Sequence, residues 1–105
     1  MTNDRFLTAR EVYQLLKDIA LGVRLLRKAG QRGWSGEGSG AVALDVEGWR
    51  LVLYNELGHL DHCSECTSPE GRRGDHERWA RFGTDPTQLL SQWERGQLER
   101  LLQAL

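Results

Sequence analysis

Two cysteines and three histidines fall within eighteen residues in the middle of the chain: His59, His62, Cys63, Cys66 and His76. Zinc takes four ligands in a tetrahedron, and a Cys-x-x-Cys pair supplies two thiolates from one tight turn. Imidazoles on either side of the pair can complete the set. We therefore predict a structural zinc site whose ligands are Cys63, Cys66, His76 and His59.

His62 is left out of this ligand set because it is next to Cys63, and adjacent side chains rarely converge on one ion. Its neighbour Asp61 could act instead as a hydrogen-bond acceptor behind an imidazole. A single Cys-x-x-Cys pair also fits a plainer interpretation, in which two half-buried thiols lie near three surface imidazoles. The sequence leaves both interpretations open.

Redox or nucleophilic chemistry at the same cysteines is an enzymatic alternative. A thioredoxin-like pair opens a helix that lowers the thiol pKa, whereas residues 67–71 after Cys66 have the composition of a turn. A Cys–His nucleophile would need an oxyanion site and an orienting third residue, and neither can be named. We therefore expect a non-enzymatic protein and keep a small Cys/His redox or hydrolytic enzyme as an alternative.

Charge is distributed unevenly along the chain, although the formal net charge is only −1. Residues 1–33 carry a net +4 and residues 34–71 a net −6. Two basic groups could contact phosphates: Arg24, Arg27, Lys28 and Arg32, and Arg72, Arg73, Arg78 and Arg81. Acidic residues interrupt the second group, and no nucleic-acid-binding motif is recognisable. A metal-stabilised nucleic-acid-binding protein is thus a further alternative, but nucleic acid is not the partner we expect.

The segment before the cysteine–histidine cluster begins with a helical pattern. Thr8 and Glu11 have the spacing of a capping box. Apolar residues then recur three or four positions apart, as on one face of a helix: Val12, Leu15, Leu16, Ile19, Val23 and Leu26. Gly30 is a ready C-terminal stop. We predict a helix from about Ala9 to about Ala29.

A hairpin and a long loop are predicted next. The β-prone runs 41–46 and 49–55 flank Glu47-Gly48, a two-residue turn containing glycine. Residues 57–75 are polar and rich in Gly, Ser, Asp and Glu, which predicts a loop. Loops of this length are uncommon in small domains unless they are functional or held in place by a crosslink. The predicted metal ion would hold this loop in place.

Three short helical segments are expected after the loop. Residues 75–82 favour a short helix with Trp79 and Phe82 on one side, and Asp85-Pro86 opens a second helix with Asp85 as its cap. Ser91 starts a capping box at the beginning of a last helix that carries a leucine stripe. Trp79 flanks polar residues and could line a pocket or a contact surface, but we expect it to lie in the core or to be partly buried.

These elements predict one α+β domain over residues 1–105, with an N-terminal helix, a β-hairpin in a small antiparallel sheet, a long loop and two or three C-terminal helices. The apolar fraction of 39% is enough for one modest core. No apolar run is long enough to span a membrane, and residues 1–5 lack an export segment. We therefore expect a cytoplasmic protein with no membrane contact.

Several stretches of the sequence resemble a family of small bacterial proteins known only as a domain of unknown function. The resemblance lies in residues 7–12, the Gly48-Trp49 hairpin to Tyr54-Asn55, Leu60-Asp61 with Cys63 and Cys66, residues 68–72, 93–95 and 98–102, and Leu105. It implies a complete, stand-alone protein and brings no activity, substrate or cofactor.

The expected function follows from these exclusions. No set of acid, base and nucleophile can be assembled, and a basic segment lies beside an acidic one. We expect a protein-binding or regulatory module, with a possible structural zinc ion and another protein as its partner. The C-terminal leucine stripe could also serve a homodimer.

Overall fold

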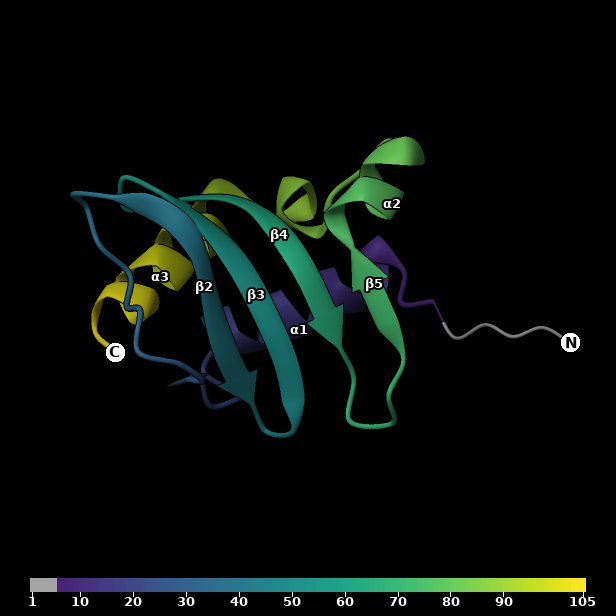
Figure 1. The fold of residues 1–105 in the computed structure, drawn as a ribbon, viewed down its shortest axis with the longest axis horizontal. Coiled ribbons are helices and arrows are strands. Elements are labelled where there is room, and N and C mark those ends of the chain that lie inside the picture. Colours follow the sequence, from purple (N-terminus) through teal and green to yellow (C-terminus); the bar gives the residue numbers. More distant parts are fainter. Residues whose placement is uncertain (1–5) are drawn as a thin grey trace, which may run out of the picture.

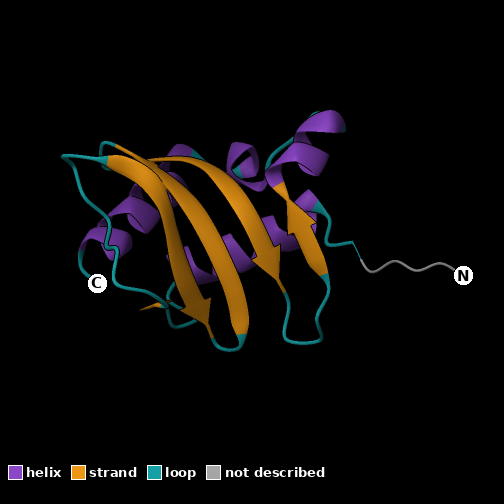
Figure 2. Cartoon of the chain, in the orientation of Figure 1, coloured by secondary structure: helices purple, strands orange, loops and turns teal. Residues whose placement is uncertain are grey.

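The computed structural model describes residues 6–105 and shows a five-stranded antiparallel sheet with helices packed on one face (Figures 1 and 2). The strands follow one another in chain order as a meander: β1 (Arg27–Lys28), β2 (Ser39–Val46), β3 (Trp49–Glu56), β4 (His59–Thr67) and β5 (Arg73–Asp75). Helices α1 (Ala9–Ala20) and α3 (Gln92–Gln103) lie behind the sheet in the view of Figure 1. The predicted α+β class is confirmed.

Helix α1 begins where the sequence predicts and ends earlier. The Thr8 side chain accepts a hydrogen bond from the backbone of Glu11, and the Glu11 side chain accepts one from the backbone of Thr8. The predicted end at Ala29 is wrong, because the helix stops at Ala20 and Gly22 adopts a φ of 80°. Glycine takes this left-handed conformation without strain, so the chain turns back and residues 27–28 pair with β2.

The β2–β3 hairpin confirms the prediction around Glu47-Gly48. Both turn residues have positive φ, 51° and 95°, as the tight type I′ connection requires. The pairing runs without interruption from Ser39 opposite Glu56 to Val46 opposite Trp49. The inward-facing side chains are therefore buried in strict alternation on β2, at Val42, Leu44 and Val46.

The segment 57–75 is not a long loop, which corrects the prediction. Leu57 and Gly58 form a second turn with positive φ, 53° and 93°, and the chain continues directly into β4 and then β5. The register of β4 against β3 shifts twice, so that Asp61 and Ser64 are extra residues without a partner on β3. Each bulge inserts one residue, and the strand therefore lacks the period of two that predicts strands.

Two of the three C-terminal helical segments start at the predicted caps, Asp85 and Ser91, and the first starts after Asp75, which the prediction had placed within the helix. Helix α2 (His76–Arg81) is capped by Asp75, the 3₁₀-helix η1 (Pro86–Leu89) by Asp85, and α3 by Ser91. In each case the capping side chain accepts a hydrogen bond from a backbone N–H of the first turn. No helix of residues 6–105 is long and apolar enough to cross a membrane.

One core lies between the sheet and helices α1 and α3. It contains residues from both layers, among them Val12, Leu16, Ile19, Leu44, Leu51, Leu53, Leu98 and Leu102. Arg72, just before β5, fixes the start of α1 to the sheet, since its guanidinium donates to Glu11 at 2.8 and 3.0 Å and to the carbonyl of Phe6 at 3.1 Å. This ion pair holds the pKa of Glu11 below its usual range.

Candidate functional site

The two cysteines face the core from β4. The bulge at Ser64 lies between them, so both side chains point to the same face of the sheet although they are three residues apart. Cys63 and Cys66 are free thiols with no exposed surface. Burial raises the pKa of Cys66 to about 12 and, together with nearby Cys66 and Asp85, raises that of Cys63 well above its usual range. Both are therefore neutral thiols at neutral pH.

The other two predicted zinc ligands lie apart from one another. His59 is at the start of β4 with its side chain 80% exposed, and its Nδ1 is 3.9 Å from the Glu99 carboxylate on α3. His76 begins α2 and faces Asp85. Within residues 6–105, no group of three or more His, Cys, Asp and Glu side chains is arranged to hold a metal ion. The zinc site at Cys63, Cys66, His76 and His59 thus stays a prediction, without support from this geometry.

A buried carboxylate organises the residues around His76. Asp85 is only 2% exposed and accepts hydrogen bonds from the backbone of Cys63 at 3.2 and 3.3 Å, and from the backbone and hydroxyl of Thr87 at 2.9 and 2.7 Å. Its Oδ2 is 2.9 Å from Nδ1 of His76. Asp85 thus accepts the hydrogen bond of a backbone N–H at the edge of β4, caps η1 and orients the His76 imidazole. These hydrogen bonds explain why a carboxylate is buried here.

His62 lies beside His76 on the side of β4 that faces away from the core. The two ring centroids are 4.3 Å apart, and Nδ1 of His62 is 2.7 Å from Oδ2 of Asp61. Tyr54 on β3 stacks on His62 with centroids 5.0 Å apart and an angle of 9°. A hollow of about 370 Å³, here called the histidine hollow, is lined by Asp61, His62, His76, Ala80, Gly83, Asp85 and Gln88.

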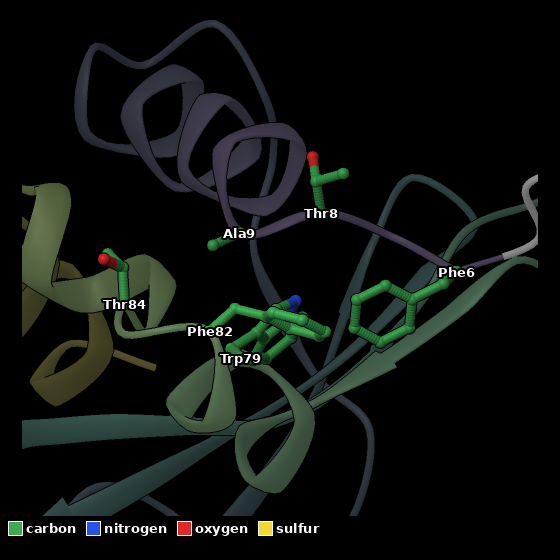
Figure 3. Close-up of a pocket in the computed structure, with 6 residues that line it drawn as sticks. All are labelled: Phe6, Thr8, Ala9, Trp79, Phe82 and Thr84. Carbon is green, nitrogen blue, oxygen red and sulfur yellow. The ribbon is translucent and has the colours of Figure 1, made fainter.

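A second hollow is apolar and lies between α2 and the segment that leads into α1. This aromatic hollow has a volume of about 320 Å³ and is lined by Phe6, Thr8, Ala9, Trp79, Phe82 and Thr84. Figure 3 shows the Phe6 ring beside those of Trp79 and Phe82, which overlap in this view, below Thr8 and Ala9. Trp79 is buried and its Nε1 donates to the carbonyl of Leu7 at 2.9 Å, whereas Phe82 is 78% exposed.

The position of Trp79 depends on a glycine in β5. A Cβ atom on Gly74 would lie 2.5 Å from the Trp79 ring and 2.8 Å from the carbonyl of Leu7, distances too short for any side chain. Gly74 therefore lets α2 pack tightly on β5, and Trp79 becomes the fixed floor of the aromatic hollow. The expectation that Trp79 is buried agrees with this position, in which it also lines the hollow.

Helix α2, which forms one wall of the aromatic hollow, carries two arginines. The guanidinium of Arg78 lies 4.4 Å from the centroid of the Phe6 ring, and Arg81 is exposed in the last turn of α2. Neither forms an ion pair with another residue in the range 6–105. One cationic side chain, that of Arg78, therefore lies beside the Phe6 ring that lines the hollow.

Sequence reasoning did not find the pairing of His76 with Asp85. The two residues are nine positions apart, and α2 must fold between them before their side chains meet. The Asp61–His62 pair was visible as adjacent residues, and its hydrogen bond agrees with the acceptor role that the sequence suggested for Asp61. The juxtaposition of His62 and His76 depends on β4 being a strand.

Comparison with known proteins gives a family but no activity. The comparison with curated proteins gave no match, and the comparison with solved structures gave none either. One family model, described as "Domain of unknown function (DUF7693)", matches residues 6–104, which is nearly the whole chain. The resemblance seen in the sequence is thereby confirmed: the chain belongs to this family of unknown function.

Proposed function

We propose that the protein is a non-enzymatic protein-binding module that holds one large apolar side chain of a partner protein in the aromatic hollow. The observation that carries this proposal is Phe82, which is 78% exposed at the mouth of the hollow. A large aromatic side chain left in water beside a second aromatic ring is typical of a contact site.

The size and preorganisation of the aromatic hollow support binding of a side chain. Its volume of about 320 Å³ is at the lower end of the range for ligand pockets. The buried hydrogen bond from Trp79 to Leu7 and the cap at Asp75 fix the wall that α2 contributes. A wall that is already ordered loses little entropy when a partner binds.

The charge around the hollow favours an acidic partner segment. Arg78 lies beside the Phe6 wall and Arg81 is exposed on the same helix, so carboxylates that flank the inserted side chain would find basic partners. We therefore expect a peptide segment in which one Leu, Phe or Trp is surrounded by Asp and Glu. A cytoplasmic location, which we also infer, fits the two free thiols, because such thiols persist in reducing compartments.

The test uses synthetic peptides of defined composition and two matched variants. One peptide set places Leu, Phe or Trp between acidic residues, and the control set replaces the acidic residues with Lys. Phe82→Ala should weaken binding of the acidic set by about tenfold, which corresponds to about 1.4 kcal/mol. Trp93→Ala removes another exposed aromatic, 56% exposed on α3 and outside the hollow, and should leave binding unchanged.

Two outcomes would overturn the proposal. Equal binding of the acidic and Lys peptides would remove the role of the arginines, and equal losses in both variants would remove the role of the hollow. Light scattering on the free protein separates the remaining possibility of a homodimer, in which a second copy of the chain would fill the hollow.

A further inference from the structure

The histidine hollow brings together two imidazoles that have the same kind of support. Nδ1 of His62 faces the carboxylate of Asp61 at 2.7 Å, and Nδ1 of His76 faces that of Asp85 at 2.9 Å. We propose that His62 and His76 together bind one divalent transition-metal ion, with Zn²⁺ as the reference ion, through their Nε2 atoms. This site is separate from the aromatic hollow and does not depend on the proposed function.

The carboxylates of Asp61 and Asp85 determine which imidazole nitrogen of His62 and His76 is available to a metal ion. An ionised carboxylate only accepts hydrogen bonds, so the hydrogen in each pair belongs to Nδ1 of the imidazole. In the neutral ring, Nε2 then carries the lone pair that a metal ion needs. A carboxylate behind the far nitrogen of the ring is the arrangement that usually supports metal-bound histidine, because it fixes the tautomer and the ring orientation.

The distance between the rings suits a shared ion. Two imidazoles that bind one tetrahedral ion through Nε2 at about 2.0–2.1 Å bring their centroids to roughly 5 Å of each other. The His62 and His76 centroids are 4.3 Å apart, and the rings are inclined by 39°. The two rings are therefore close enough to be ligands of one ion once side-chain rotation directs both Nε2 atoms to it.

The charge of the hollow favours a cation. Asp61 and Asp85 belong to its lining, and no Lys or Arg side chain does. Asp85 is already saturated by donors from Cys63, Thr87 and His76, so it supports the ligands and is not one of them. Ala80 and Gly83 leave space in the hollow, so the open positions of the ion can be taken by water or by a partner's side chain.

The thiols on the opposite face of β4 are poorer ligands than these imidazoles. Cys63 and Cys66 have no exposed surface and point into the core, so an ion in the histidine hollow cannot reach them. His62 and His76, in contrast, present nitrogen atoms, and imidazole suits Zn²⁺, Cu²⁺ and Ni²⁺. The proposed ligand set therefore keeps His76 from the sequence prediction and replaces the cysteines and His59 with His62.

The experiment titrates the reduced, chelator-treated protein with Zn²⁺ in a calorimeter. We expect one ion per chain, and at least a tenfold loss of affinity in both His62→Ala and His76→Ala. His59→Ala is the matched control, because His59 is an exposed histidine on the same strand and outside the histidine hollow, and its affinity should equal that of the parent protein.

A second readout identifies the ligand atoms. Co²⁺ in place of Zn²⁺ should give spectra without a thiolate-to-metal charge-transfer band. Such a band, a loss of affinity in His59→Ala, unchanged affinity in His62→Ala, or no Zn²⁺ binding at millimolar concentration would each overturn the proposal. If His76→Ala proves unfolded by circular dichroism, the comparison of His62→Ala with His59→Ala decides alone.

Discussion

The two faces of strand β4 carry different chemistry. Leu60, Cys63 and Cys66 point into the core and are at most 3% exposed, whereas His62 is half-buried on the other face beside Tyr54 and His76. Cysteine is the more reactive of the two residue types, yet burial keeps both thiols protonated at neutral pH. His62, which the sequence prediction left out of the ligand set, and His76, which it included, have oriented rings and a hollow in front of them.

This difference teaches that spacing alone does not identify a reactive cysteine pair. A Cys-x-x-Cys pair on a regular strand would put one thiol on each face, and the bulge at Ser64 puts both on the core face. Both thiols therefore pack in the core, and the following predictions test the division between the two faces.

The largest effect on the free energy of unfolding is expected at Asp85, where the two faces of β4 meet. Asp85→Ala leaves the backbone N–H of Cys63 and the N–H and hydroxyl of Thr87 without their acceptor in a buried position. We expect a loss of about 3 kcal/mol in the free energy of unfolding, measured by urea denaturation. Asp61→Ala, at the exposed carboxylate that faces His62, should cost about 0.5 kcal/mol. Similar losses in both variants would contradict the account.

A smaller loss is expected when the core face of β4 is made polar. Cys66→Ser places a hydroxyl where a thiol packs without exposed surface, and should cost about 2 kcal/mol in urea denaturation. Ser64→Ala changes the bulged residue between the cysteines and should alter stability by less than about 0.5 kcal/mol. If Cys66→Ser were as mild as Ser64→Ala, the core assignment of the thiol would fail.

Alkaline pH should lower the free energy of unfolding because of the buried thiols on the core face of β4. In the unfolded chain a thiol loses its proton near pH 8.5, while the pKa of Cys66 in the folded protein is about 12. The stabilising contribution is thus complete below pH 8.5 and is lost as the pH rises towards 12. The free energy of unfolding should fall by about 1.4 kcal/mol per pH unit for each thiol in this window. Denaturation of Cys66→Ala from pH 8 to 10 should show a shallower slope, and an unchanged slope would be evidence against the raised pKa.

The smallest effect on the free energy of unfolding is expected on the face of β4 that carries His62. His62→Ala removes a ring that stacks on Tyr54 at the surface, and should change the free energy of unfolding by about 0.5 kcal/mol. His59→Ala, with its exposed side chain, gives the baseline for histidine removal in the same urea experiment. A loss above 2 kcal/mol for His62→Ala would mean that this face, too, is mainly structural.

The regular half of the sheet could be predicted from the sequence, and the bulged half could not. On β2 and β3 the apolar residues alternate around a glycine turn, which is a local signal. On β4 the buried residues Leu60, Cys63 and Cys66 recur every three positions, because each interval contains a bulge. Nothing local distinguishes this spacing from a polar loop, and the strand becomes evident only when β3 is beside it.

Helix starts were predicted better than helix ends and site geometry. Thr8, Asp85 and Ser91 cap the segments that follow them, as expected from residues within four positions. The early end of α1 depends on Gly22 and on the pairing of residues 27–28 with β2, which is a contact over many residues. The histidine hollow depends on β4, α2 and η1 together, so only Asp61–His62 was visible beforehand.

The most direct test of the division between the two faces of β4 is the rate at which a soluble disulfide reagent labels the cysteines of the folded protein. We predict that Cys63 and Cys66 remain unlabelled in native buffer, with and without a metal chelator, and that both react at once in urea. Labelling in native buffer, or labelling that begins when the chelator is added, would contradict the account, because the thiols would then be accessible or metal-bound.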